Sequence, residues 1–303
     1  MLWFFIALAG YFFLALTFIL DKLILTKSVG KPVVYTFYST IFMFGALLAW
    51  PFGVELLHGV DWWWAITSGV AFGFGLWTLY KAVKSGEASH INPLNGAIVT
   101  ISTYALSFYF LSESLSSLQI LGMAVLVCAS LLLSLEKSRK HKGIHMGFVW
   151  AIVSGILFAV SHVSAKYLYE LYPFLTGFVW TRAATGFVGL FVLLFPSVRK
   201  TFKKKKTKEK PKTKAKRYAG AIVVATKVLG VVAVVLIQYA MAIGSVSLVV
   251  AMSGLQYALM FLLILFFTKF LPKIFKEYFT KRELVIEWVA ILLVVVGSML
   301  FVI

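Results

Sequence analysis

"YKAVKSGEASHINPLNG" (residues 80–96) and "YAMAIGSVSLVVAMSG" (residues 239–254) interrupt an apolar chain in the same way. Each stretch places small and polar residues between two long apolar runs. A shift of 158 residues superposes four pairs of identical residues, which are Ala82/Ala240, Gly86/Gly244, Ser89/Ser247 and Gly96/Gly254. Gly, Ala and Ser are common, so the shared order of these residues carries the signal. It indicates an internal repeat.

Composition favours a lipid environment over water for this chain. Of its 303 residues, 61% are hydrophobic and 13% charged, whereas a soluble protein carries about 25% charged residues. Ten apolar runs have the length of about 20 residues that a membrane-spanning helix needs. They lack the alternating polarity of barrel strands, so we expect helices. The predicted spans are 1–20, 33–52, 62–80, 91–111, 117–135, 146–165, 174–195, 218–240, 246–267 and 284–303.

The net charge of +18 is concentrated in one loop. Residues 197–217 hold ten Lys, two Arg and one Glu, which is +11 of the total. Almost no aromatic residues are interleaved with these charges, and no nucleic-acid-binding fold is indicated, so nucleic acid is excluded as a partner. We expect a cytoplasmic loop that touches anionic lipid head groups. The other connections alternate in charge the same way, which predicts that both termini lie outside.

Two further shifts extend the repeat over the whole chain. A shift of 144 pairs Lys22 with Lys166 and Tyr38 with Arg182, and a shift of 168 pairs Ser130 with Ser298. The predicted units are residues 1–140 and 145–303, with five helices each. Because five is odd, the second unit would cross the membrane in the opposite direction to the first. Such inverted repeats are typical of transporters that bind substrate between the halves and rock to alternate access.

The turn "SGEASHINPL" and the segment "FYFLSESLSSLQILGMAVLVCASLLL" (residues 108–133) resemble the EamA-like members of the drug/metabolite transporter superfamily. Glu113, Gly122 and Ala129-Ser130 match the glutamate and the small positions of that pattern, and Gly297-Ser298 keep the small pair in the second half. Ala251 replaces the helix-leading proline there. The resemblance implies an all-α membrane protein of ten helices in two inverted five-helix repeats, and secondary transport of small metabolites, amino acids or related solutes, often by export. It implies no ATP site, and the sequence contains no phosphate-loop motif GxxxxGK[ST].

Polar residues within the runs are the candidates for a substrate site. Pro93 is predicted in the first turn of a helix starting at 91, whose free N–H groups would face inward. His162 is the best proton carrier because no Asp or Glu lies mid-membrane, although a packed histidine is the plainer interpretation. Arg182 is either a bidentate clamp for a carboxylate or phosphate or a snorkelling residue. Glu113 is interpreted as a helix-start residue.

The remaining candidates can each be explained by packing or by substrate binding. The amides suit both solute hydrogen bonds and helix contacts, and the aromatic residues suit both cavity walls and plain packing. Lys227 faces either the cavity or the surface. These substrate-binding candidates are Tyr38, Trp77, Tyr80, Asn92, Asn95, Trp180, Lys227, Gln238 and Gln256.

The sequence therefore predicts a multi-pass secondary transporter for a small polar metabolite, with no cofactor or metal, and a proton as the candidate coupling ion. We expect a monomer or a homodimer. A lipid-linked sugar flippase or an uncoupled facilitator is the alternative. An intramembrane enzyme is disfavoured, because the sequence has neither an HExxH motif nor a membrane-embedded Asp pair. A single Cys128 permits no intrachain disulfide.

Overall fold

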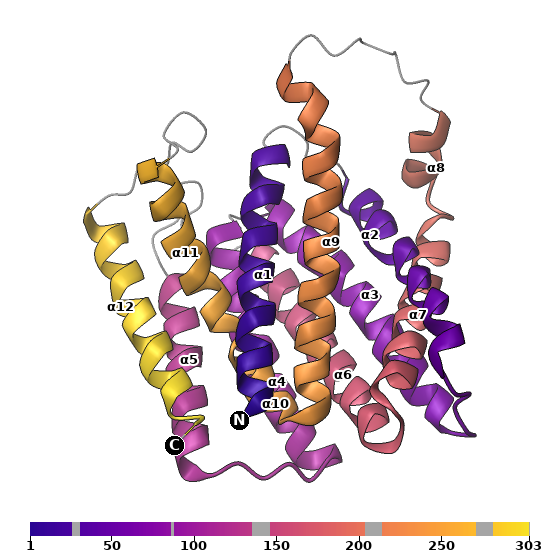
Figure 1. The fold of residues 1–303 in the computed structure, drawn as a ribbon, viewed down its shortest axis with the longest axis horizontal. Coiled ribbons are helices and arrows are strands. Elements are labelled where there is room, and N and C mark those ends of the chain that lie inside the picture. The colour runs from indigo at the N-terminus through magenta and orange to yellow at the C-terminus, as the bar shows by residue number, and fades with distance from the viewer. Residues whose placement is uncertain (26–30, 86–87, 135–145, 204–213, 271–280, 303) are drawn as a thin grey trace.

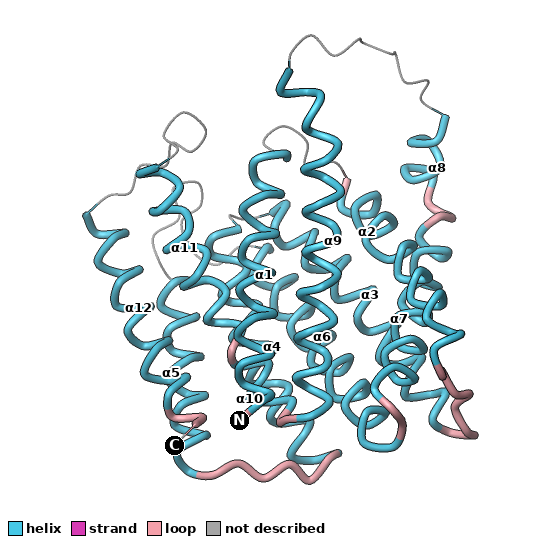
Figure 2. The backbone as a smooth tube through the Cα atoms, viewed as in Figure 1, coloured by secondary structure: helices cyan, strands magenta, loops and turns pink. Residues whose placement is uncertain are grey.

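The computed structural model describes residues 1–25, 31–85, 88–134, 146–203, 214–270 and 281–302. In this part of the chain every regular element is a helix, and Figure 2 draws no strand. The result agrees with the all-helical class expected from the apolar runs, since a helix satisfies its own backbone hydrogen bonds in lipid.

The helices form one bundle, drawn in chain order from indigo to yellow in Figure 1. Their bounds are α1 (Leu2–Leu25), α2 (Pro32–Ile41), η1 (Phe42–Phe52), α3 (Asp61–Ser85), α4 (Ala88–Phe110), α5 (Ser117–Ser134), α6 (Met146–Leu171), α7 (Phe174–Val192), α8 (Pro196–Lys203), α9 (Lys214–Ile243), α10 (Val246–Ala251), α11 (Ser253–Phe270) and α12 (Lys281–Met299).

Six helical segments of the described residues are long and apolar enough to cross a membrane. Two shorter apolar helices, Val228–Ile243 and Leu284–Met299, accompany them. The helices α3 and α4 also have spanning length but carry more Ser, Thr, Gly and Asn. The six segments are Leu2–Leu20, Pro32–Phe52, Ser117–Ser134, Met146–Leu171, Phe174–Val192 and Val246–Phe270.

Small residues bring several helix pairs into close contact, as is usual in membrane bundles. A Cβ at Gly69 of α3 would lie 2.5 Å from the backbone nitrogen of Thr185 in α7. A Cβ at Gly122 of α5 would lie 2.6 Å from the carbonyl oxygen of Gly297 in α12. The helix α3 also packs extensively against α6, and α1 against α9. The small positions matched by resemblance, Gly122 and Gly297, are thus contact points between α5 and α12, the last helices of the two predicted units.

Three elements differ from the predicted spans. The predicted helix 33–52 is α-helical only to Ile41 and continues as the 3-10 helix η1, which contains Pro51 and ends at Gly53 with a left-handed φ of 86°. Proline has no N–H to donate, and glycine adopts positive φ without steric cost. The predicted span 246–267 is divided at Met252 into α10 and α11. The short helix α8 was not predicted and begins the basic loop.

Both chain ends lie at one end of the bundle in Figure 1, together with the connections α4–α5, α6–α7 and α9–α10. The helix α8 and the first turns of α9, which flank the basic loop, lie at the opposite end. We call these the terminal end and the basic end. Both termini thus share one end of the bundle, as expected, and the described segments that flank the basic loop share the other.

Candidate functional site

Arg182 is the centre of the candidate site. It lies in the middle of α7 and is only 2% exposed. Its guanidinium carbon lies 4.5 Å from the ring centroid of Phe72 in α3 and 5.6 Å from that of Phe178. Among the described residues, its Nε and Nη1 atoms have no hydrogen-bond partner. The ring faces attract the cation but do not accept hydrogen bonds from its N–H groups. These N–H groups can therefore still donate strong hydrogen bonds to another group.

Polar groups of two other helices lie beside this arginine. His162 and Tyr169 of α6 are both close enough to Arg182 to interact with it electrostatically. The Tyr169 hydroxyl donates to Gln238 Oε1 of α9 over 2.8 Å. The Nδ1 atom of His162 is buried and has no partner among the described residues. The site therefore holds a cation, an imidazole, a phenol and an amide in an otherwise apolar interior.

Local sequence explains this convergence. His162 and Tyr169 are seven residues apart, which places them on one face of α6. Gly177 in α7 leaves room for the Tyr169 ring, since a Cβ there would lie 2.8 Å from Tyr169 Cδ1. The Phe158 ring packs against both Phe72 and His162, with centroids 5.3 and 6.4 Å apart. We define the Arg182 cluster as Phe72, His162, Tyr169, Phe178, Arg182 and Gln238.

The structure brings three of the candidates together, namely His162, Arg182 and Gln238. Sequence reasoning missed Tyr169 and Phe72. A usable signal existed for Tyr169, because it follows His162 by two helical turns. Phe72 carried no signal, because a phenylalanine in an apolar run says nothing about the helix it faces.

The two asparagine candidates of α4 contact other helices, Asn95 through its side-chain amide and Asn92 through its backbone carbonyl. Asn95 Nδ2 donates to the carbonyl oxygen of Ala151 in α6 over 2.9 Å. The carbonyl of Asn92 accepts from the Tyr257 hydroxyl of α11 over 2.7 Å. Gln256 of α11 is 7% exposed. These polar contacts join the first part of the chain to the second across the bundle interior.

The predicted start of this helix was wrong. The helix α4 begins at Ala88, so Asn92, Pro93 and Asn95 lie beyond its first turn. Pro93 therefore does not lead the helix but lacks an N–H inside it. The free N–H groups expected at residue 91 are consequently used within the helix, and an anion site there has no support.

Three aromatic candidates lie towards the basic end, away from the Arg182 cluster. The Tyr80 hydroxyl lies 2.7 Å from Ser39 Oγ. Trp77 contacts the Lys81 ammonium, which lies 4.7 Å from its ring centroid. Tyr38, the repeat partner of Arg182, is 45% exposed and packs edge-on against Phe37. The repeat therefore does not conserve the chemistry of this position.

Trp180 belongs to the terminal end. Its Nε1 donates to the Glu55 carbonyl oxygen over 2.8 Å, and its ring packs edge-on against Trp50 and Trp62. Trp180 is two residues from Arg182, so it points to another face of α7. The candidate Lys227 lies in α9, and its side chain is outside the described residues.

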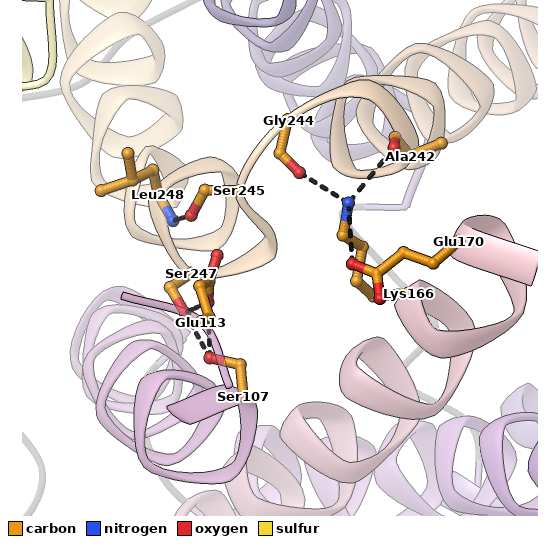
Figure 3. Close-up of polar contacts among 9 residues, drawn as sticks. All are labelled: Ser107, Glu113, Lys166, Glu170, Ala242, Gly244, Ser245, Ser247 and Leu248. Carbon is orange, nitrogen blue, oxygen red and sulfur yellow. Dashed lines mark hydrogen bonds and ion pairs between the residues drawn. The ribbon is translucent and has the colours of Figure 1, made fainter. Parts of the chain in front are cut away.

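Figure 3 shows two groups of polar contacts at the terminal end. Ser107 Oγ donates to Glu113 Oε2 over 2.5 Å, and Ser247 Oγ donates to the same oxygen. The two serine hydroxyls lie 2.7 Å apart. We call these three residues the Glu113 cluster. The assignment of Glu113 as a helix-start residue was wrong, because it lies in the connection before α5 and links α4 to the start of α10.

The second group is centred on Lys166. Its Nζ donates to the carbonyl oxygens of Ala242 and Gly244, over 3.2 and 2.9 Å, at the end of α9. It also lies 3.5 Å from Glu170. A lysine at the C-terminal end of a helix is favourable because unpaired carbonyls and the helix dipole both attract it. Lys166 therefore fixes the end of α9 against α6.

Tyr172 fastens the α6–α7 connection to the segment before α3. Its hydroxyl donates to Asp61 Oδ2 over 2.6 Å and accepts from the backbone N–H of His58 over 3.0 Å. Because the Asp61 carboxylate accepts a hydrogen bond from the phenol, the pKa of Tyr172 is raised above its usual value. The hydroxyl therefore stays protonated at neutral pH. No group of three or more His, Cys, Asp or Glu that could hold a metal is found among the described residues.

The bundle and its apolar spans define a multi-pass integral membrane protein. A model of the EamA-like transporter family matches residues 1–135. The match covers the first part of the chain, and this family belongs to the drug/metabolite transporter superfamily. Members of this family are transporters and not enzymes.

A solved structure titled only "Crystal structure of protein" has a similar fold. It has a TM-score of 0.66 and 16% sequence identity, and the match covers 99% of this chain and 95% of that one. At this identity the likeness concerns the fold alone. A comparison with curated proteins finds no match.

Proposed function

We propose that the protein is a secondary transporter that moves a small polar metabolite across the membrane by alternating access, with the Arg182 cluster as its substrate site. The observation that carries this proposal is the arginine itself. A charged side chain in the middle of a spanning helix is costly in lipid, and it is tolerated where it faces a partner or a hydrated path. Arg182 lacks an ionic partner among the described residues, so a solute is the partner that this position calls for.

We further propose ten spans in two inverted halves, 1–140 and 145–303. The observed helix bounds support the repeat, since a shift of 158 carries α4 from Ala88 to Val246, where α10 begins. The packing supports it too. The pairs α3–α6 and α1–α9 make the most extensive contacts among the described helices, and the repeat relates one pair to the other, since it matches α1 with α6 and α3 with α9. It likewise exchanges α4–α6 for the contact between α1 and α11.

Alternating access needs contacts between the halves that break and reform. The terminal end has such contacts. The Glu113 cluster joins α4 to α10, and Tyr172 and Trp180 of the second half bond to Asp61 and the Glu55 carbonyl of the first. We infer that this end is closed in the present state, and that transport requires these bonds to open.

A proton is the coupling ion that the cluster serves best. Imidazole is the side-chain type that ordinarily exchanges a proton near neutral pH, and His162 lies beside Arg182. A second positive charge next to a buried arginine is unfavourable unless an anion lies nearby. Substrate and proton would therefore bind together at this site, which is the basis of coupling.

The proposal is tested by flux. Purified protein is reconstituted into liposomes, and gradient-driven uptake of labelled organic acids, amino acids and amines is compared with protein-free liposomes. The expected result is saturable, protein-dependent uptake of at least one solute class. If no solute crosses faster than in protein-free liposomes, the transporter assignment for this chain is wrong.

A further inference from the structure

The charges around Arg182 restrict the kind of solute that the cluster accepts. The groups around the guanidinium are the Phe72 ring of α3, His162 and Tyr169 of α6 and the Phe178 ring of α7 itself. Gln238 of α9 joins the cluster through its hydrogen bond with Tyr169. No ion pair to Arg182 is found in the described residues, and two of its three side-chain nitrogens are buried without a partner there. No described residue therefore supplies the anion that would balance the charge of Arg182.

Two lysines lie on the same helices as residues of the Arg182 cluster. Lys166 lies one turn beyond His162 on α6, but it pairs with Glu170 and donates to the end of α9. Lys227 is eleven residues from Gln238 along α9, which is about 16 Å at the rise of an α-helix. Lys166 therefore adds no second positive charge to the cluster. Among the described side chains, the centre carries one permanent positive charge, that of Arg182.

A single positive charge selects among solutes by charge balance. A carboxylate with no other charge neutralises Arg182 fully, and its planar oxygens suit the guanidinium donors. An amino acid would also bring an ammonium group, and the cluster holds no carboxylate to receive it. A phosphate ester would bring nearly two negative charges. Either solute would leave an unpaired charge in the low-dielectric interior of the bundle, where an unpaired charge is costly.

We propose, as a narrowing of the proposed function on which it rests, that the substrate of the Arg182 cluster is a small organic monocarboxylate without an ammonium group. The carboxylate binds the free nitrogens of Arg182. The rings of Phe72, Phe158 and Phe178 face an apolar body, and this excludes highly charged solutes. Small size follows from the close packing of these rings around the arginine.

Binding to purified protein in detergent tests this assignment with probes of one size. The probes are lactate as the monoanion, L-alanine as the zwitterion, alaninol as the cation, propanediol as the neutral solute and methylphosphonate, at a pH above its second pKa, as the dianion. The shift of the thermal unfolding midpoint with probe concentration gives each apparent Kd. We expect lactate to stabilise the wild type most. In Arg182→Met its binding weakens about tenfold or more, as for loss of a charged hydrogen bond.

Lys81→Met is the matched control. Lys81 is also a cation in contact with aromatic rings, lying 4.7 and 4.3 Å from the ring centroids of Trp77 and Trp150, but it is outside the cluster. Its substitution should leave lactate affinity unchanged. Arg182→Lys keeps the charge and loses the planar fork, so it should weaken binding less than Arg182→Met. If Arg182→Met does not fold, the ranking of probes on the wild type and on Arg182→Lys decides.

The outcomes separate this inference from the proposed function. Preferred binding of alanine, alaninol or methylphosphonate that depends on Arg182 would overturn the monocarboxylate and leave the site intact. Lactate binding that is equal in wild type and Arg182→Met would also overturn it. The monocarboxylate would also be overturned if lactate did not stabilise the wild type while a solute of another class was transported. Absence of both binding and flux would end the transporter proposal too.

Discussion

The guanidinium of Arg182 in α7 lies over the ring of Phe72 in α3, 4.5 Å from its centroid. This contact joins the two proposed halves of the chain at the buried polar centre. It also explains how an arginine without an ionic partner among the described residues is held in position. The ring face offsets part of the cost of burial while the N–H edges stay available.

Removing the Phe72 ring should destabilise both the protein and the Arg182 cluster. Phe72→Leu is expected to lower stability by about 1–2 kcal/mol, because a desolvated cation–π contact and core volume are both lost. Thermal unfolding in detergent measures this. The matched control is Phe74→Leu on the same helix, whose ring packs on Trp77 and Phe191 and not on Arg182. In an Arg182→Met background, Phe72→Leu should lower stability no more than Phe74→Leu does. An unchanged cost there would contradict the coupling of the two residues.

The close approach of α3 and α7 depends on Gly69. A Cβ at this position meets the backbone of Ala184 and Thr185, which cannot move aside. Gly69→Ala is expected to cost about 1–3 kcal/mol, the usual range for overpacking. Gly45→Ala is the control, because nothing lies within 4 Å of its added Cβ. Equal unfolding midpoints for the two variants would argue against this helix contact.

His162 should carry the pH dependence of transport. His162→Gln keeps the size and polarity of the side chain but cannot gain a proton, so uptake in liposomes should lose its variation between about pH 5 and 8. His90→Gln in α4 is the matched control, since His90 is a buried histidine outside the Arg182 cluster. We expect it to keep the wild-type profile. A pH profile unaltered by His162→Gln would remove the histidine as the proton carrier.

The two ends of the bundle should face opposite sides of the membrane. In a Cys128→Ser background, a cysteine at His58 at the terminal end should react with an impermeant maleimide added outside intact cells. A cysteine at Lys200 in α8 should react only after the cells are opened, because basic segments stay in the cytoplasm. Labelling of the Lys200→Cys variant from outside would reverse the predicted orientation.

The apolar runs predicted the helical class because spanning length and composition are set locally. Helix ends were harder to predict. The apolar run placed the start of α4 at residue 91, with Pro93 in its first turn, yet the helix begins at Ala88 and contains the proline. The break at Met252 and the 3-10 helix η1 were also missed, since neither leaves a periodic signal.

The polar centre was predicted in part for a physical reason. Charged and amide residues are rare in apolar spans, so Arg182, His162 and Gln238 could be recognised one by one. Which of them meet depends on helix packing, and packing separates Trp180 and Tyr80 from the cluster. The aromatic partner Phe72 is common in such a chain and could be found only from the structure. The Glu113 cluster likewise joins residues 134 positions apart.

Locking the terminal end tests alternating access most directly. The hydroxyls of Ser107 and Ser247 lie 2.7 Å apart, so the pair Ser107→Cys and Ser247→Cys in a Cys128→Ser background is placed for a disulfide. The measurement is uptake in liposomes of a solute found to be transported, with disulfide formation quantified on the same sample. We predict that oxidation stops uptake and that a reductant restores it, while each single-cysteine variant is unaffected. Full uptake with the disulfide formed would show that the halves need not separate at this end, and would contradict alternating access as described.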